Sequence, residues 1–483
     1  MSKRWDSLFE LARDRSFHYS VCGIFFLFYN INELNGEMEF DETLIPFVVL
    51  LTLPVSLKLL LTSITNKSIP SAIFTTTVML TTLFYAHLFF LFTSSSAFIK
   101  NFLKEGYFIL LIVFFIAGIA LFLFTTKRGL KTLNLYLNVL LLVYLAMEVV
   151  ILTVTVGRVS EGRALMEYLD KSRVSGQGRP DVYFIVTDAY ANADNLKKYW
   201  NYNNNKFINA LKEKGFYYIP HSRSNYNNTG SSMASMLNNE FLTEDLNLNS
   251  TNRYIETQKK IISKIKNSRV FQEFYLKGYD IYNLSIFDIL NTKPFYFDRF
   301  LYPNFNNYLL SKTLPMRIIY RYTYMDHLSV LNELERISKE KQDRPKIVYC
   351  HLLLPHHPYI YDSTGALRPS TNPSFSRSEP YLDQLKYTNK LLEKSIDTIL
   401  RYNPKSFIIL TSDHGYRLLK NEPDKTKESF ENFVCLYFPD GDYSELYPTM
   451  TSINIFNPIF DKLHFERLRR ETDTVNFFVN KAF

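Results

Sequence analysis

Hydrophobic residues dominate the chain up to about Val156 and become much sparser after Gly157. Apolar stretches run near Ser20–Ile31, Leu44–Ile64, Ala72–Phe92, Tyr107–Thr126 and Leu133–Val156. All but the first reach about 20 residues, the length at which an α-helix crosses a bilayer. The first stretch spans only if its flank from Phe17 is included. The pattern predicts an α-helical membrane domain of about five spans over residues 1–156.

The second half of the chain alternates short apolar runs with helical patterns. Predicted strands are Val182–Thr187, Tyr279–Leu284, Lys346–His351, Ser406–Thr411 and Phe433–Tyr437. Helical stretches between them include Lys206–Lys214, Ile255–Leu276, Ser329–Lys339 and Gln384–Arg401. Continuously apolar strands alternating with helices are typical of a mainly parallel sheet covered on both faces. We therefore expect an α/β domain over residues 181–483.

Residues 157–180 form a basic juxtamembrane linker between these two parts. Their partly helical spacing fits a segment lying on anionic lipid headgroups, and it fits a solvated linker equally well. Gly176, Gly178 and Pro180 then break the helical pattern and mark the start of the second domain.

Lysine and arginine residues predict the orientation in the membrane. They flank the first span at Lys3, Arg4, Arg13 and Arg15, and the loop before the last span at Lys127, Arg128 and Lys131. By the positive-inside rule, loops rich in lysine and arginine lie in the cytoplasm. The first external loop is acidic, as this rule expects, whereas Lys100 and Lys104 lie on the external side against it. The balance places the N-terminus inside. We expect a multi-pass protein of the inner (plasma) membrane whose second domain is extracytoplasmic (periplasmic).

Composition excludes several classes of protein. The net charge is +8, but no basic run with interleaved aromatics indicates nucleic-acid binding. The three cysteines fit no disulfide framework and no Cys/His zinc pattern. Lys58, His87 and Glu148 lie inside predicted spans, where ionisable residues are functional candidates. Because the spans show no repeat pair, an anchor or lipid-access platform is favoured over a transporter.

Residues able to bind metal or move protons follow three of the predicted strands. They are Asp188, then His351, His356 and His357, and finally Asp413 with His414. An aspartate at one strand end is usually a turn or cap residue. Because ligands of open α/β sheets bind at the carboxyl ends of the strands, three such endings together indicate a functional site.

A candidate nucleophile lies in the polar loop after the first strand. Thr229 and Gly230 open a helix-like run of small residues and methionines. A hydroxyl there would lie at a helix N-terminus, where amide N–H groups and the helix dipole favour an anion. The alternative is that Thr229 only caps the helix.

Four motifs together resemble the alkaline phosphatase superfamily: IVTDAY at Asp188, SNYNNTGSSMASMLN at Thr229, HLLLPHHPY and TSDHG. More specifically, the chain is similar to membrane-anchored sulfatase-like proteins related to lipoteichoic acid synthases and lipid A phosphoethanolamine transferases. The resemblance implies an alkaline-phosphatase-like α/β domain after about five spans. It also implies one divalent metal ion, Mn²⁺, Mg²⁺ or Zn²⁺, held by Asp188, Thr229, Asp413 and His414.

The same resemblance implies roles for the remaining polar residues. His356 would contact the transferred group or protonate the leaving group, and His357 competes for that role. His357 and Asn225 are the expected substrate contacts, while His351 would be structural or supporting. A hydroxyl nucleophile on the metal has a lowered pKa and is oriented for in-line attack.

The chain departs from sulfatases proper at two positions. Thr229 cannot become the formylglycine that those enzymes use, and Ala189 replaces the second aspartate of their paired motif. Phosphodiester chemistry is therefore favoured over sulfate-ester hydrolysis. The leading hypothesis is a phosphotransferase that moves a phosphoethanolamine or phosphoglycerol head group from a membrane lipid to an envelope glycan or lipid. Alternatives are a hydrolase of phosphate or sulfate esters, and a non-catalytic envelope protein. The sequence indicates neither the head group nor the oligomeric state.

Overall fold

A computed structural model of the chain divides into two compact units. It describes residues 9–33, 40–94, 105–126, 129–155, 160–242, 251–290, 292, 295, 309–310, 312–315, 327–368, 378–417 and 425–476. The first unit comprises Met1–Ala164 with Asn304–Thr323, and the second comprises Leu165–Pro303 with Tyr324–Phe483.

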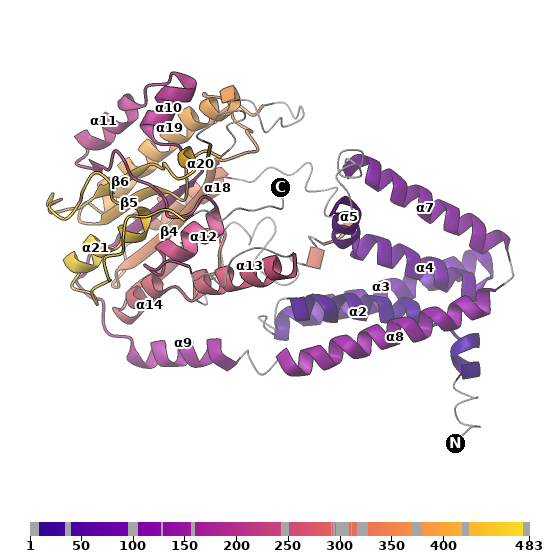
Figure 1. The fold of residues 1–483 in the computed structure, drawn as a ribbon. Helices are drawn as coiled ribbons and strands as arrows, with labels where there is room; N and C mark the ends of the chain where they lie inside the picture. The colour runs from indigo at the N-terminus through magenta and orange to yellow at the C-terminus, as the bar shows by residue number, and fades with distance from the viewer. Residues whose placement is uncertain are drawn as a thin grey trace. The chain divides into compact units, whose positions relative to one another are not determined.

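The first unit is helical and apolar (Figure 1). Its helices are α2 (His18–Glu33), α3 (Phe40–Thr65), α4 (Ser68–Leu83), α5 (Tyr85–Ser94), α7 (Glu105–Thr125) and α8 (Leu130–Thr155). Within the described residues, α3, α7 and α8 are long and apolar enough to cross a membrane. The helices α2, α4 and α5 are shorter. The chain is thus a membrane protein by its apolar helices, while the count of five spans stays a prediction.

A buried polar network fixes the start of α2 against α4 and α8. The His18 ring lies between Thr76 Oγ1 at 2.5 Å from Nδ1 and Asn134 Oδ1 at 3.1 Å from Nε2. Asn138 Oδ1 accepts hydrogen bonds from the backbone amides of Phe17 and His18. Because polar groups buried among apolar helices must be paired, this network determines how α2 and α8 meet.

The third predicted span is interrupted at Phe84, which separates α4 from α5. There the amide of Ala86 donates a hydrogen bond to the carbonyl of Lys312, 3.1 Å away. Lys312 belongs to a segment that is distant in sequence. Leu309 and Leu314 of that segment pack into the apolar core of the helical unit. An amide freed from the helical ladder needs another acceptor, and this segment provides one.

The second unit is built on a six-stranded sheet with strand order β2-β6-β5-β1-β4-β3. The strands are β1 (Val182–Asp188), β2 (Tyr217–Tyr218), β3 (Asp280–Leu284), β4 (Lys346–Pro355), β5 (Phe407–Ser412) and β6 (Val434–Tyr437). The strands β1, β3, β4 and β5 pair in parallel, as expected. The strands β6 and β2 pair antiparallel, so the sheet is mixed but mainly parallel.

Helices cover both faces of this sheet (Figure 1). One layer contains α10 (Ala193–Trp200), α11 (Asn205–Glu213), α18 (His327–Lys339) and α19 (Ser378–Tyr402). The other contains α12 (Thr229–Met236), α13 (Thr251–Lys266), α14 (Arg269–Leu276) and α21 (Asn457–Lys462). Along β1, Phe184 packs into the second layer and Ile185 into the first. This alternation explains the continuous apolar run, because a strand buried on both faces needs apolar residues at every position.

Part of the linker is helical. The helix α9 runs over Ser160–Ser172, and its residues Leu165, Met166 and Leu169 pack into the core of the second unit. The apolar side chains that would fit a membrane-surface helix therefore pack against the second unit. The expected Ile255–Leu276 helix is divided into α13 and α14, because Ser268 caps α14 through Phe271 N.

Candidate active site

Parallel strand pairing brings the predicted strand-end residues together. Thr187 of β1 is in register with Ser412 of β5, and Asp188 with Pro355 of β4. The pairing shifts register between Thr187 and Asp188, and the next residue, Ala189, has a positive φ of 58°. A left-handed backbone costs energy at alanine, so the surrounding contacts must hold it in place. The bend turns the Asp188 side chain toward the loop that follows β5.

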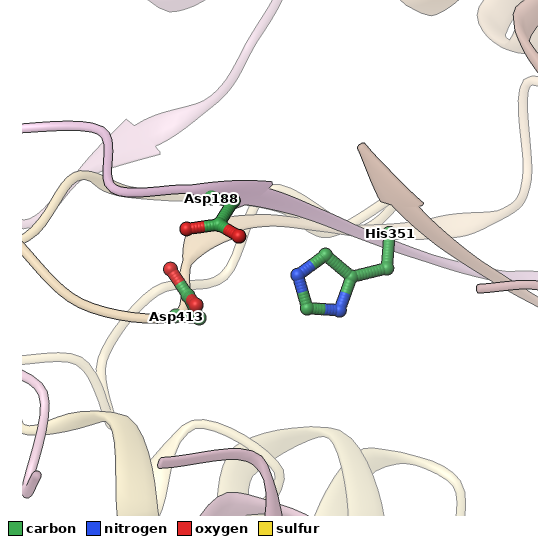
Figure 2. A group of neighbouring side chains, drawn as sticks. All are labelled: Asp188, His351 and Asp413. Atoms are coloured by element: carbon green, nitrogen blue, oxygen red, sulfur yellow. The ribbon is translucent and has the colours of Figure 1, made fainter. Parts of the chain in front are cut away.

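Two carboxylates and two imidazoles converge at this point. Figure 2 shows three of them, Asp188, His351 and Asp413. Ligand atoms of Asp188, His351 and Asp413 all lie within 4.8 Å of one another. His414 Nε2 lies 3.7 Å from Asp188 Oδ1 and 3.5 Å from Asp413 Oδ2. All of these side chains are buried. The structure thus gathers three of the predicted metal ligands and adds His351.

Hydrogen bonds on the far side of Asp413, His414 and His351 determine which of their atoms face the centre. Asp413 Oδ1 accepts from the amides of Ala189, at 3.0 Å, and His414, at 2.7 Å. His414 Nδ1 contacts the carbonyl of Gly415 at 2.7 Å, which leaves Nε2 as the acceptor nitrogen. His351 Nδ1 pairs with the Tyr349 hydroxyl at 3.0 Å. The remaining atoms are Asp188 Oδ1, Asp413 Oδ2, and Nε2 of both histidines. They are buried, and none has a hydrogen-bond partner among the described residues.

The electrostatics of the cluster disfavour its apo form. Burial raises the pKa of Asp188 well above its usual value, and the Asp413 charge raises it further. Burial lowers the pKa of His414 well below its usual value, and lowers that of His351 to about 4. Both rings are therefore neutral at pH 7, and neither can neutralise the carboxylates.

The cluster fits a divalent metal ion. Buried acceptor atoms without donors, two carboxylates and two neutral imidazoles are the arrangement that a cation stabilises. Ligands of oxygen and nitrogen type suit Zn²⁺, Mn²⁺ or Mg²⁺. The residues that would hold the ion are Asp188, Asp413 and His414, with His351 as a further candidate.

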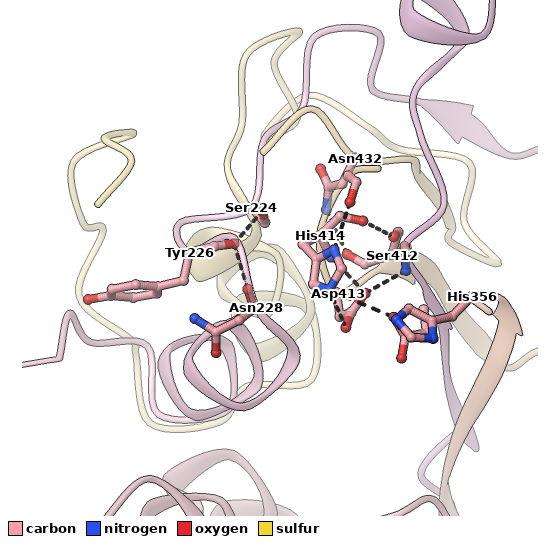
Figure 3. A network of polar contacts seen from close by, with 12 residues as sticks. Ser224, Tyr226, Asn228, His356, Ser412, Asp413, His414 and Asn432 are labelled. Carbon is pink, nitrogen blue, oxygen red and sulfur yellow. Dashed lines mark hydrogen bonds and ion pairs between the residues drawn. The ribbon is translucent and has the colours of Figure 1, made fainter. Parts of the chain in front are cut away.

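Residues 429–432 connect the three loops around this cluster. The Asn192 amide, after Asp188, donates to the Glu431 carbonyl at 3.2 Å, and the Gly415 amide donates to Ser429 at 2.9 Å. The Ser224 amide, before Thr229, donates to the Phe430 carbonyl at 2.8 Å. Asn432 donates to the Ser412 carbonyl at 2.7 Å (Figure 3). One short segment therefore holds the Thr229 loop to the loops that carry Asp188 and Asp413.

Gly415 is required for this arrangement. A Cβ atom there would lie 2.2 Å from the Glu428 carbonyl oxygen and 2.6 Å from that of Glu431. Both neighbours are backbone atoms, so they cannot move aside as a side chain would. The glycine that follows Asp413–His414 thus permits the close approach of residues 428–431.

His356 and His357 follow β4, with ring centroids 4.1 Å apart. His356 Nδ1 contacts the His357 carbonyl at 2.6 Å, which leaves Nε2 as the acceptor nitrogen. Burial lowers the pKa of both rings, that of His357 to about 3. The hydroxyls of Tyr359 and Tyr416 lie 3.4 Å apart and tie this loop to the one carrying His414. Both histidines are thus neutral bases at pH 7, and their catalytic roles stay predictions.

Thr229 is the first residue of α12, and it does not cap the helix. The cap is Asn228, whose Oδ1 accepts a hydrogen bond from Ser231 N at 2.9 Å. The Thr229 side chain is partly buried, and its hydroxyl makes no hydrogen bond within the described part of the chain. The capping alternative for Thr229 is therefore wrong. Within the described structure, this hydroxyl at a helix N-terminus is therefore not committed to capping or to another hydrogen bond.

Asn225, four residues before Thr229, is held by the C-terminal segment. Its Nδ2 donates to Thr451 Oγ1 at 3.1 Å and to the Thr474 carbonyl at 2.8 Å. Its Oδ1 accepts from Ile453 N at 2.8 Å. The amide is buried and engaged in these contacts. Its expected contact with substrate stays a prediction, and its visible contacts position the Thr229 loop.

Asp473 is the centre of that C-terminal segment. Its carboxylate accepts from Thr451 N and Oγ1, at 2.9 and 2.8 Å, and from Tyr447 Oη at 2.7 Å. Asn454 Nδ2 donates to it at 3.1 Å. These hydrogen bonds lower the pKa of Asp473 despite its partial burial. An ionised Asp473 therefore fixes Thr451, and Thr451 in turn fixes Asn225.

We expect Asp473→Ala to lower turnover by on the order of ten- to hundredfold while metal content stays at the wild-type level. The reason is that the substitution releases the Thr229 loop without touching a metal ligand, and small misplacements cost about that much. Stability should fall by about 1–3 kcal/mol. The control is Asp440→Ala, which removes an exposed carboxylate paired with Lys462. Equal rates in both folded variants would contradict the positioning role.

The sequence of the chain matches a known protein family. The sulfatase family profile matches residues 180–460. The chain belongs to the sulfatase family. This family lies in the alkaline phosphatase superfamily, so the chain is an enzyme of that superfamily. No curated protein matches the sequence of this sulfatase-family chain.

Three solved structures are similar to the chain at low sequence identity. The zinc complex of the periplasmic domain of EptC from Escherichia coli is 12% identical, with a TM-score of 0.42, and covers 65% of this chain and 92% of that chain. The periplasmic domain of the phosphoethanolamine transferase EptC from Campylobacter jejuni is 15% identical, with a TM-score of 0.40, covering 60% and 91%. The membrane protein lipooligosaccharide phosphoethanolamine transferase A from Neisseria meningitidis is 15% identical, with a TM-score of 0.37, covering 93% and 94%.

Sequence reasoning missed one charged residue of this sulfatase-family site, Arg417. It is exposed, lies three residues after His414, and forms no ion pair with a described residue. Its charge opposes the upward pKa shift of Asp188 and helps to lower the pKa values of His414 and His356. An exposed cation beside a buried site is suited to an anionic substrate. Only its spacing from the Asp–His–Gly motif could have indicated it.

Proposed function

We propose that this sulfatase-family chain is a membrane phosphotransferase with Thr229 as its nucleophile. It would move a phospho-head group, of phosphoethanolamine or phosphoglycerol type, from a lipid donor to a glycan or lipid of the cell envelope. The observation that carries the proposal is the uncommitted Thr229 hydroxyl at the N-terminus of α12, in a loop tied to the buried Asp–His cluster. The apolar helices support a lipid donor and a multi-pass location in the inner membrane with the catalytic domain in the periplasm.

The reaction divides into two displacements at phosphorus. In the first, Thr229 Oγ1 attacks the phosphodiester and the lipid alcohol leaves. His356, neutral by its lowered pKa, takes the Thr229 proton and gives it to the departing oxygen. In the second, His356 takes the proton of the acceptor hydroxyl, which attacks the phosphothreonine, and returns it to Thr229. Each displacement forms one P–O bond and breaks another, and the proton moves from the attacking to the departing oxygen. No other reactant is therefore required.

The predicted ligands are Asp188, Thr229, Asp413 and His414, with His351 as a candidate added by the structure. A divalent ion there would lower the pKa of the Thr229 hydroxyl and stabilise negative charge on the phosphoryl oxygens. Arg417 lies at the exposed end of the loop that carries Asp413 and His414, and it would attract the phosphate group of the substrate. His357 would contact the transferred group beside His356.

A second function has support from the family match itself. A sulfatase-like hydrolase would use the same residues, with water in place of the acceptor hydroxyl. Thr229 argues against sulfate chemistry of the formylglycine type, because threonine cannot be converted to that group. Phosphodiester hydrolysis without an acceptor remains the closer rival.

The test is the mass of the peptide that contains Thr229. Full-length protein is loaded with metal and incubated with vesicles of phosphatidylethanolamine or of phosphatidylglycerol. We expect Thr229 to gain the corresponding phospho-head group, with release of diacylglycerol, and the mass gain to disappear in Thr229→Ala. Efficient cleavage of a sulfate ester with an unmodified Thr229 would contradict the proposal and favour the hydrolase.

A further inference from the structure

Glu148 is an ionisable residue inside one of the helices that can cross a membrane. It lies on α8, within the apolar segment Leu130–Thr153. Its partner is Asn32 of α2, whose Nδ2 donates to Glu148 Oε2 and to the Glu148 carbonyl, both at 2.7 Å. Within the described chain, no lysine, arginine or histidine forms an ion pair with Glu148. Such residues inside spans are costly and are retained for a function.

The pair has acceptor atoms left over. Asn32 Oδ1 is buried and has no hydrogen-bond partner, and Glu148 Oε1 accepts nothing from a described residue. The side-chain donor of the pair, Asn32 Nδ2, makes both of its hydrogen bonds in the described structure to Glu148. A helix contact alone would be satisfied by one hydrogen bond. The remaining oxygens, together with the negative charge, suit a ligand that is cationic and carries several N–H donors.

Aromatic residues lie on the same helix faces as the pair. Tyr29 precedes Asn32 by three residues and Tyr144 precedes Glu148 by four, which places each pair on one face of its helix. The two faces meet, because the rings of Phe25 and Tyr144 lie 5.8 Å apart. Aromatic faces attract ammonium groups, and the effect increases where water is excluded. Figure 1 shows α2 and α8 running side by side.

The pair lies near one end of each helix. Asn32 is the penultimate residue of α2, and Glu148 lies seven residues before the end of α8. Seven residues correspond to about 10 Å of helix. This is the end of α8 from which the chain continues into the catalytic domain, so the pair lies toward the leaflet on that side.

We propose that Glu148 and Asn32 bind the primary ammonium group of an ethanolamine phospholipid in this leaflet. The inference rests on the proposed function and adds to it the recognition of the donor's head group by the membrane domain. Glu148 supplies the counter-charge, while Asn32 Oδ1 and Glu148 Oε1 accept N–H hydrogen bonds. A choline head group has no N–H to donate, and a glycerol head group has no positive charge. Both should bind more weakly.

The test uses full-length protein in nanodiscs of equal parts phosphatidylethanolamine, phosphatidylcholine and phosphatidylglycerol. Lipids that stay with the protein after detergent extraction are quantified by mass spectrometry. We expect the wild-type protein to enrich phosphatidylethanolamine, and Glu148→Gln to reduce that enrichment at least tenfold. The control is Glu10→Gln, which removes an exposed carboxylate outside the spans. Wild-type protein without preference for phosphatidylethanolamine would overturn the proposal whether or not the variant folds.

A second measurement separates this site from the catalytic centre. Glu148→Gln should cleave a water-soluble chromogenic phosphodiester at the wild-type rate, while its transfer from phosphatidylethanolamine falls at least tenfold through a higher KM. If both rates are unchanged, Glu148 and Asn32 form a helix contact only. If the wild-type protein enriches phosphatidylethanolamine through Glu148 but transfers no head group, the ammonium site stands and the transferase fails.

Discussion

Thr229→Ala should reduce phosphodiester turnover by on the order of a thousandfold or more, while the protein stays folded and keeps its metal-binding carboxylates. A covalent nucleophile cannot be replaced by a methyl group, and catalysis by the remaining residues is then small. Stability should change by less than about 0.5 kcal/mol, because the hydroxyl makes no hydrogen bond in the described structure. The measurements are kcat at saturating substrate and the melting temperature of the purified protein.

Two variants distinguish the nucleophile from a structural residue. Thr229→Ser keeps a hydroxyl and should retain measurable turnover. Asn228→Ala removes the true cap, so it should lower stability by about 1 kcal/mol and affect the rate less than Thr229→Ala does. A folded Thr229→Ala protein that turns over the substrate near the wild-type rate would contradict the covalent mechanism.

The sequence predicted the catalytic sheet because its parallel strands are buried on both faces. Strand β1 is apolar at almost every position, and its two sets of side chains enter two different layers. The same burial explains why Asp188 was conspicuous, since a carboxylate directly after such a strand requires a partner. The parallel order of β1, β4 and β5 then brings Asp188 and Asp413 to the same edge.

Other parts of the fold depend on contacts that no local pattern contains. The break at Phe84 follows an apolar run with no proline or glycine, and it coincides with the hydrogen bond from Ala86 to Lys312. The antiparallel strand β6 resembles its parallel neighbours in composition, so its direction could not be read from its residues. Strand β2, with two residues, is too short to give any periodic signal.

The site was only partly predictable for the same reason. Thr229 was correctly placed at the start of a helix, but Asn228 and not Thr229 is the cap, a choice that depends on the backbone turn. For His351, the family resemblance implied only a structural or supporting role. Register alone places its Nε2 beside Asp188 and Asp413. The links through Asp473 join residues about 250 positions apart, and sequence spacing does not reveal them.

Asp413→Asn should abolish metal binding and lower turnover by on the order of a thousandfold or more, with little effect on the fold. The asparagine Oδ1 can still accept the amides of Ala189 and His414, so the loop after β5 keeps its conformation. What changes is the atom that faces the cluster, where Oδ2 is buried without a donor. An amide group there supplies no charge, and a site of few ligands rarely retains a divalent ion after such a loss.

The matched control is Asp181→Asn at the opposite end of β1. Asp181 Oδ1 also accepts a backbone amide, from Lys346 at 3.0 Å, but it lies at the amino ends of the strands. Elemental analysis of the purified proteins should give wild-type metal content for Asp181→Asn and less than about a tenth of it for Asp413→Asn. Near-stoichiometric metal in a folded Asp413→Asn protein would mean that the Asp188–Asp413–histidine cluster is not the metal site. In that case the buried carboxylates would have to be stabilised by protonation of Asp188, in the direction in which its pKa is already shifted.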